Sequence, residues 1–148
     1  MTWLRLFVGT YNVAETIASE PLDTWLADAA QADLAVIGLQ EVDMRPATLL
    51  SGRTSHERET AWTNAIETAL GANGKAAMIK VRPHVVQSTS FFTTRQVASL
   101  FFGSVAIYVY ARDDLAPSCK AELGAIATGI GNLASKGGIA CRLRCAVC

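Results

Sequence analysis

The clearest hydrophobic pattern in this chain is a nearly continuous apolar run that ends in polar residues. It reads LAVIGLQEV over residues Leu34–Val42, and every position from Leu34 to Leu39 is apolar or glycine. A short run of this kind, bounded by polar residues, predicts a β-strand that is buried on both faces. Glu41 follows the end of this strand, where open α/β sheets usually place functional residues. Position alone also fits a solvated acid at a strand end, so both interpretations of Glu41 stay open on this pattern.

A strand and a helix are predicted before this run. Residues Trp3 to Val8 alternate loosely between apolar and polar types and are rich in strand formers. Pro21 suits the first turn of a helix. The apolar positions that follow it at helical spacing are Leu22, Trp25, Leu26 and Ala29. These elements predict a β-α-β unit that places Asn12 and Glu41 at matching ends of two neighbouring strands.

The remaining pattern predicts one further helix and then several strands. Thr54 and Glu57 have the spacing of a capping box, and Gly71 marks the end of the helix. Its apolar face comprises Trp62, Ala65, Ile66, Ala69 and Leu70. The predicted strands are Ala77–Val86 (interrupted by Pro83), Val105–Tyr110 with Val97–Phe102 as its upstream continuation, Leu123–Ile130 and Gly138–Cys145. This order favours an α+β fold, a mixed sheet with helices on its outer side.

Composition and charge narrow the classes of function. The 148 residues are 51% hydrophobic and 18% charged, as expected for a globular chain of one-domain size. The 13 basic and 13 acidic residues balance, which disfavours a general nucleic-acid binder. No apolar run approaches the ~20 residues that cross a bilayer, and the N-terminus lacks the order of a signal peptide. A cytoplasmic location is the expectation.

The four cysteines are Cys119, Cys141, Cys145 and Cys148. In a cytoplasmic protein they are expected to be reduced thiols rather than disulfides. Alternation along a strand places Cys141 and Cys145 on one face with Ile139 and Leu143, which indicates a core face. The spacing C-x3-C-x2-C matches no standard zinc pattern, so a zinc site is disfavoured.

Several segments together resemble one enzyme family. FVGTYNV, VIGLQEV and TGIGNLASKGGIACRLR resemble, in this order, the first, second and fourth blocks of the inositol polyphosphate 5-phosphatases, members of the endonuclease/exonuclease/phosphatase superfamily. FFGSVAIYVYAR resembles the family strand V-G-x-x-L-x-V-x-x-R. The resemblance covers nearly the whole chain but only the N-terminal half of a family catalytic domain. It implies that residues 1–148 are a partial domain, truncated on its C-terminal side, of a DNase I-like four-layered α/β sandwich.

The resemblance also implies a metal site. Glu41 would be the ligand of Mg²⁺, and Asn12 would hold the metal or the phosphate through its side-chain amide. Both would therefore be catalytic residues. The chemistry agrees, because Mg²⁺ takes hard oxygen ligands, often one or two carboxylates together with water and substrate phosphate.

A substrate-contacting turn is implied at residues 134–138. Lys136 would face the substrate phosphate, and Gly137 and Gly138 would permit close approach of the backbone. Family members have G-N-K-G where this chain has Ala134-Ser135-Lys136-Gly137, so Ser135 replaces an asparagine that orders the turn. A hydroxyl also donates and accepts hydrogen bonds, but with a shorter reach.

The implied activity is a Mg²⁺-dependent hydrolase that removes the 5-phosphate of phosphatidylinositol phosphates or inositol phosphates, with peripheral membrane contact through the lipid substrate. Family members continue with N-S-H-L, G-D-L-N-Y-R and S-D-H-x-P-V blocks, none of which occurs here. Because these blocks hold the His and Asp that activate water, the 148 residues alone are expected to be inactive. Two alternatives stay open: another superfamily hydrolase of the nuclease or sphingomyelinase type, or a non-catalytic half-domain that binds a partner chain.

Overall fold

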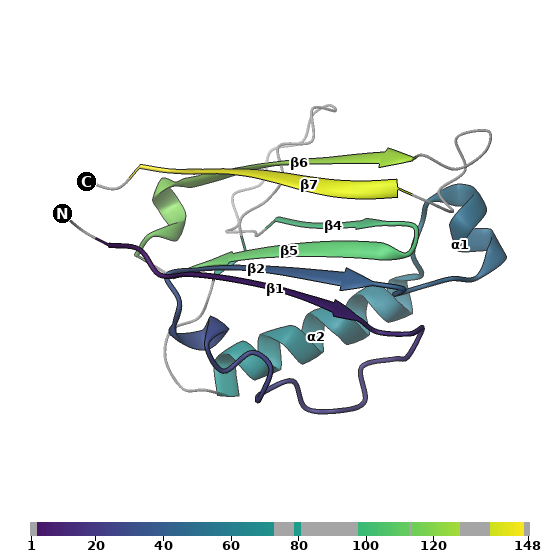
Figure 1. Cartoon of the computed structure of the whole chain (residues 1–148), viewed down its shortest axis with the longest axis horizontal. Helices are drawn as coiled ribbons and strands as arrows, with labels where there is room; N and C mark the ends of the chain where they lie inside the picture. Colours follow the sequence, from purple (N-terminus) through teal and green to yellow (C-terminus); the bar gives the residue numbers. More distant parts are fainter. Residues whose placement is uncertain (1–2, 73–78, 81–97, 113, 128–136, 147–148) are drawn as a thin grey trace.

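The chain forms two β-sheets, with helices against the larger one (Figure 1). The computed structural model describes residues 3–72, 79–80, 98–112, 114–127 and 137–146. Its elements are β1 (Leu6–Asn12), η1 (Ala29–Gln31), β2 (Leu34–Gln40), α1 (Pro46–Ser51), α2 (His56–Ala72), β3 (Ile79–Lys80), β4 (Ala98–Phe102), β5 (Val105–Ala111), η2 (Ala116–Ser118), β6 (Cys119–Ala127) and β7 (Gly137–Cys145). In the described part of the chain, no helix is both long and apolar enough to span a bilayer.

The larger sheet is mixed. Its strand order is β1-β2-β5-β3, and β4 also pairs with β5. β1 and β2 are parallel, in a register that runs from Leu6 opposite Leu34 to Asn12 opposite Gln40. β5 is antiparallel to β2. The parallel pairing brings the C-terminal ends of β1 and β2 together, so the predicted juxtaposition of Asn12 with the end of the second strand is confirmed.

The face of this sheet beneath α2 carries the main core, because alternate strand residues point to it. Ile37 and Leu39 from β2 and Tyr108 from β5 are almost fully buried against Trp62 and Ile66 of α2. The predicted apolar face of this helix is therefore confirmed. Figure 1 shows α2 running along the lower side of the sheet.

The start of α2 differs from the prediction. The Thr54 hydroxyl donates to the backbone oxygen of Gly103 at 2.8 Å, so it joins the helix entry to the β4–β5 turn. Ser55 Oγ instead accepts the backbone N–H of Arg58 at 3.5 Å. The capping-box assignment to Thr54 was wrong because a tertiary contact recruits that hydroxyl, and the capping position moves one residue along the chain.

The segment between β1 and β2 is not the α-helix predicted there. Residues 23–28 form turns, and only the three residues of η1 are helical. The N–H of Leu26 bonds to the oxygen of Leu22 at 2.9 Å, and that of Ala30 to Leu26 at 3.1 Å. These isolated bonds keep the helical spacing that buries Leu22 and Leu26. Too few turns follow to overcome the cost of helix nucleation, so the apolar spacing persists without a regular helix.

Three strand predictions also need correction. The first strand begins at Leu6 rather than Trp3, whose side chain is 86% exposed, and it extends to Asn12. Val97–Phe102 does not continue into the next strand: β4 turns back at Gly103, which has φ 59°, and pairs antiparallel with β5. The strand predicted at Leu123–Ile130 begins earlier, at Cys119, as β6. Of Ala77–Val86, all but the two residues of β3 lie outside the described residues.

The second sheet consists of β6 and β7, which pair antiparallel from Cys119 opposite Cys145 to Ala127 opposite Gly137. It lies on the side of the larger sheet that faces away from α2 (Figure 1). A second core fills the space between the sheets: Leu34, Ala98, Val109, Ala111, Leu115, Ala116, Cys119 and Ala121. The prediction of an α+β fold that forms part of an α/β sandwich is therefore confirmed.

The cysteine prediction was wrong for one pair. Cys119 and Cys145 form a disulfide, with their Cα atoms 4.1 Å apart. The register of β6 and β7 makes these residues direct cross-strand partners, which spacing along the sequence does not reveal. Cys141 is a free, half-buried thiol on the inner face of β7, and burial raises its pKa. Cys148 lies outside the described residues.

Candidate metal and phosphate site

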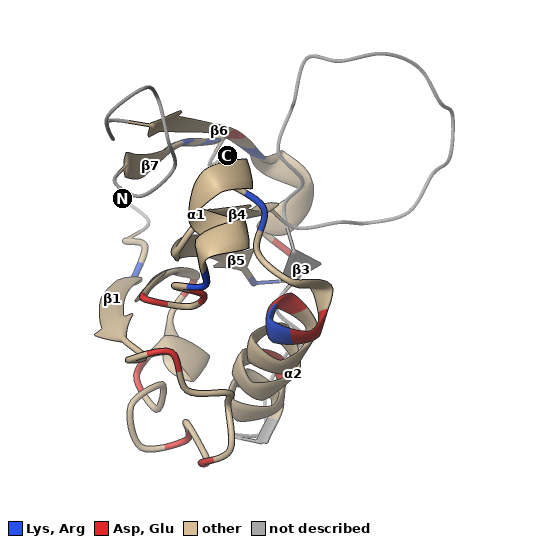
Figure 2. Ribbon diagram, turned by 90° about the vertical axis from the view of Figure 1, so that its right-hand side faces the viewer, with Lys and Arg blue, Asp and Glu red and all other residues tan. Residues whose placement is uncertain are grey.

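The loops that leave β1 and β2 are joined by backbone hydrogen bonds. The N–H of Val13 donates to the oxygen of Gln40, and the N–H of Glu15 donates to the oxygen of Glu41, each at 2.9 Å. Asn12 and Glu41 therefore lie at one edge of the sheet, as the sequence predicts. Figure 2 views this edge, with acidic and basic positions gathered around it and in the first turn of α2.

Glu41 has an unusual backbone conformation. Its φ of 57° lies in the left-handed region, which costs a non-glycine residue about 1 kcal/mol. Among the described residues, Ala14 and Glu15, with φ values of 46° and 59°, are the other non-glycine residues with positive φ. All three lie in the two joined loops. Such strain persists where the surroundings hold it in place, and it clusters at functional sites.

The Asn12 side chain shapes the first loop. Its Oδ1 accepts the backbone N–H of Ala14 at 2.9 Å, forming an Asx turn. The residue is exposed, and the amide oxygen has a second lone pair. Asn12 therefore acts as a turn residue and still presents an oxygen that is chemically suited to a hard cation.

Arg58 ties both loops to α2. Its Nη1 donates to the backbone oxygen of Glu15 at 2.5 Å and to that of Val42 at 2.8 Å. Glu15 in turn accepts the backbone N–H of Met44 through Oε1 at 2.9 Å. One guanidinium thus joins the loop after β1 to Val42, the residue that follows Glu41. The sequence offers no signal for this role, because Arg58 reads as a solvated residue at a helix start.

Asp43 is a second residue that the sequence analysis missed. It is fully buried, and its carboxylate accepts hydrogen bonds from Arg45 Nε at 2.8 Å, Arg45 Nη2 at 2.6 Å and the backbone N–H of Ser55 at 3.1 Å. The Arg45 guanidinium holds the pKa of this carboxyl well below its usual range. Asp43 thereby fixes the chain between Glu41 and α2. The only feature of the sequence that could have indicated this role is that Asp43 is a second acidic residue two positions after Glu41.

The predicted phosphate-contacting turn is described only at its last residues. Lys136 and Ser135 lie outside the described residues, and Gly137 is the first residue of β7. A Cβ on Gly137 would collide with the backbone oxygen of Ile126 and lie 3.1 Å from Cε1 of Phe102. A Cβ on Gly138 would meet nothing within 4 Å. Packing alone therefore requires glycine at position 137, independently of any substrate.

This difference predicts opposite outcomes for two neighbouring substitutions. Gly137→Ala should destabilise the protein by about 1–3 kcal/mol, because backbone atoms rather than a flexible side chain obstruct the new methyl group. Gly138→Ala should be neutral or slightly stabilising, since strand glycines carry an entropic cost. Urea unfolding of both variants checks this. Equal free energies of unfolding for the two would contradict the assignment.

The donor atoms at this edge suit a hard divalent cation. Glu41 offers a carboxylate and Asn12 an amide oxygen, which are the ligand types that Mg²⁺ prefers. The described residues contain no group of three or more His, Cys, Asp or Glu side chains that could enclose a metal. Mg²⁺ commonly binds through one or two protein oxygens and completes its shell with water and phosphate, so the residues present fit this ion.

The two sheets, and the acid and the amide where two parallel strands end, agree with the arrangement that the resemblance to the endonuclease/exonuclease/phosphatase superfamily implies. The chain belongs to Endonuclease/Exonuclease/phosphatase family 2, whose sequence profile matches residues 9–147. It is 30% identical over 142 residues to the mouse type II inositol 1,4,5-trisphosphate 5-phosphatase, covering 95% of this chain and 12% of that protein. It is also 28% identical over 144 residues to the Schizosaccharomyces pombe inositol-1,4,5-trisphosphate 5-phosphatase 1, with 94% and 12% covered. The resemblance inferred from the sequence is confirmed.

A solved structure shares the fold. It is the inositol polyphosphate 5-phosphatase domain of spSynaptojanin, determined in complex with inositol (1,4)-bisphosphate and a calcium ion. The TM-score is 0.66 at 21% sequence identity, over 95% of this chain and 36% of that one. The chain therefore spans about a third of that domain's length and about an eighth of the two full-length relatives.

Proposed function

We propose that this chain is the metal- and phosphate-binding part of a Mg²⁺-dependent phosphatase that removes the 5-phosphate from inositol phosphates or phosphatidylinositol phosphates. The observation that carries the proposal is Glu41, a non-glycine residue with a φ of 57° beside Asn12. Backbone strain of this kind persists where the surroundings hold a residue in place, and it clusters at sites where a side chain is positioned for function. The names of both full-length relatives support the same substrate class.

In this proposal each site residue has a stated role. Glu41 and Asn12 supply the oxygen atoms that hold Mg²⁺, and the ion supplies the positive charge that offsets the charge developing on the phosphate. Lys136 contacts that phosphate, and Ser135 and Gly137 shape the turn that carries it. Arg58 and Asp43 are positioning residues. Arg58 binds the backbone oxygen of Val42, next to Glu41, and that of Glu15 in the neighbouring loop, and Asp43 ties the chain after Glu41 to the start of α2.

We further propose that residues 1–148 are part of a larger catalytic domain, located in the cytoplasm and at membranes where its lipid substrates lie. Two observations support this. The chain covers 36% of the solved 5-phosphatase domain. Leu6 and Val8, which alternate with the residues facing α2, are 60% and 63% exposed on the sheet face that β6 and β7 partly cover. Further strands packed there would bury this apolar surface.

Phosphate release from inositol 1,4,5-trisphosphate tests both parts of the proposal. The 148-residue chain, purified at 15.8 kDa, should release no phosphate above background with Mg²⁺. The natural product isolated from its source cells should be larger and should release phosphate only with Mg²⁺, and it should leave DNA and sphingomyelin intact.

The possible outcomes separate the two parts. Mg²⁺-dependent release by the 148 residues alone, lost in Glu41→Gln, would overturn the partial-domain proposal and support the function. Natural product that cleaves DNA or sphingomyelin but not the inositol phosphate would overturn the function. Release that persists undiminished in Glu41→Gln would overturn the metal site.

A further inference from the structure

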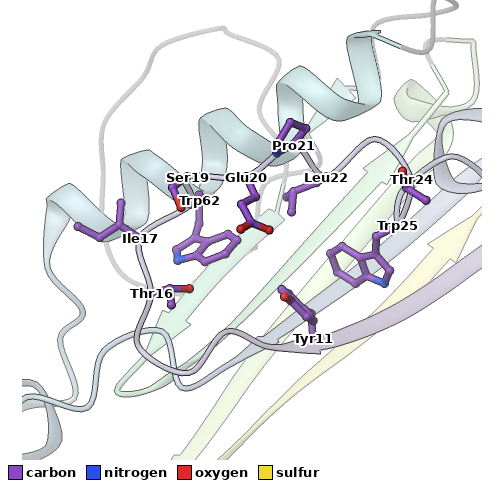
Figure 3. Close-up of a pocket in the computed structure, with 11 residues that line it drawn as sticks. Tyr11, Thr16, Ile17, Ser19, Glu20, Pro21, Leu22, Thr24, Trp25 and Trp62 are labelled. Atoms are coloured by element: carbon purple, nitrogen blue, oxygen red, sulfur yellow. The ribbon is translucent and has the colours of Figure 1, made fainter.

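A cavity of about 470 Å³ lies between α2 and the segment that joins β1 to β2. It is separate from the residues proposed to hold metal and phosphate. Its walls come from residues between Tyr11 and Trp25, together with Trp62 from α2 (Figure 3). This volume is within the range of pockets that enclose small organic ligands.

Aromatic rings line the cavity on several sides. The ring centroids of Tyr11 and Trp25 are 5.3 Å apart, with their planes inclined at 41°, so they form two adjoining walls. Trp62 lies across from them in Figure 3. The faces of such rings are electron-rich and attract cations, most strongly for tryptophan.

The charge of the cavity is negative. The Glu20 carboxylate points into the space between Trp62 and Trp25 (Figure 3). Among the described residues, no lysine or arginine lines the cavity. Glu20 itself is exposed and has no hydrogen bond or ion pair within the described part of the chain. This arrangement repels phosphate groups and leaves a carboxylate available to a cation.

Trp62 borders the cavity without offering it a polar contact. Its side chain is 2% exposed, and its Nε1–H is buried without a hydrogen-bond partner among the described residues. Because that atom has almost no accessible surface, a ligand in the open cavity does not reach it.

We propose that this cavity binds a small organic ammonium compound, such as choline. The ammonium group lies against the rings of Tyr11 and Trp25 and near the Glu20 carboxylate. This function goes beyond the phosphatase proposal, since the ligand is a cation and the site uses neither Asn12 nor Glu41.

Titration with choline tests the ammonium requirement. The chain has three tryptophans, and Trp3→Phe removes the exposed one, so that the remaining fluorescence reports on Trp25 and Trp62. Choline chloride should give a saturable fluorescence change at constant ionic strength. The neutral isostere 3,3-dimethyl-1-butanol should bind at least about 5-fold more weakly, because it keeps the shape and the hydroxyl but lacks the charge.

Two substitutions test the named contacts. Glu20→Gln should weaken choline binding about 3- to 10-fold, whereas Glu122→Gln, an exposed acid on β6, should leave it unchanged. Tyr11→Leu should likewise weaken choline binding, because it removes one of the two rings that contact the ammonium group. Circular dichroism confirms that each variant is folded before its affinity is compared.

Three results would overturn the proposal. These are the absence of a saturable signal with choline, equal affinity for choline and its neutral isostere, and choline affinity that is unchanged in folded Glu20→Gln. Equal affinity for the isostere would identify the cavity as merely apolar. Binding by phosphatidylcholine vesicles but not by free choline would likewise reject a soluble ligand.

Discussion

Asp43→Ala should lower the free energy of unfolding by about 3 kcal/mol. The carboxylate is fully buried and accepts two hydrogen bonds from the Arg45 guanidinium, one from the Arg45 backbone N–H and one from the backbone N–H of Ser55. Charge-assisted bonds of this kind contribute about 1.5–3 kcal/mol each, and their loss also leaves the start of α2 without an acceptor. Urea unfolding of the wild-type chain and the variant at pH 7 measures the difference.

A matched substitution at an exposed ion pair distinguishes the effect of buried hydrogen bonds from the effect of ion pairing alone. Asp114 also pairs with an arginine, Arg112, at 2.6 Å, but its side chain is 67% exposed. Asp114→Ala should change stability far less than Asp43→Ala, since exposed ion pairs contribute little. If both variants lose the same stability, the buried hydrogen bonds of Asp43 do not carry the effect.

The same carboxylate predicts a pH dependence. Its pKa in the folded protein lies below the ordinary value of 3.8, with the Arg45 hydrogen bonds as the main cause. The stability that Asp43 contributes is therefore fully present above about pH 4 and is lost as the pH falls through the lower, folded pKa. Unfolding measured between pH 5 and pH 2 should show less acid destabilisation in Asp43→Asn than in the wild-type chain. A variant with the same acid sensitivity as wild type would contradict this.

The hydrophobic pattern correctly predicted the strands and the helix whose apolar residues are buried in the core. The run from Leu34 to Leu39 is a strand because both of its faces are covered, and the apolar stripe of α2 faces the sheet. The β-α-β order then placed Asn12 and Glu41 at one edge. These features depend on residues that are close together in the sequence, which periodicity can detect.

Features that depend on distant partners escaped the sequence analysis. The Cys119–Cys145 bridge requires the register of β6 and β7, because the two cysteines are 26 positions apart in the sequence. Arg58 reaches Glu15, 43 residues earlier, and Thr54 bonds to Gly103, 49 residues later. The left-handed backbone of Glu41 is equally invisible to composition, because glutamate rarely adopts it. Tertiary contacts therefore determine the details that support the candidate site.

Glu41→Gly should make the chain more stable while it removes function. Glycine adopts a φ of 57° without steric cost, so the substitution should raise the free energy of unfolding by about 1 kcal/mol. Glu41→Gln keeps the strained backbone and removes only the charge, so it should leave stability nearly unchanged. In the natural product, both variants should lower Mg²⁺-dependent phosphate release by at least about 100-fold, because a metal ligand is lost.

Ala14→Gly completes the comparison. Ala14 has a φ of 46° in the neighbouring loop and carries no functional group, so glycine there should relieve similar strain and preserve activity. One result would support the metal site: Glu41→Gly and Ala14→Gly both raise the free energy of unfolding, and only Glu41→Gly loses activity. The strain at Glu41 would then be retained because the carboxylate is needed there. Should Glu41→Gly instead be less stable than Glu41→Gln, the side chain stabilises the fold and its conformation is no sign of a metal site.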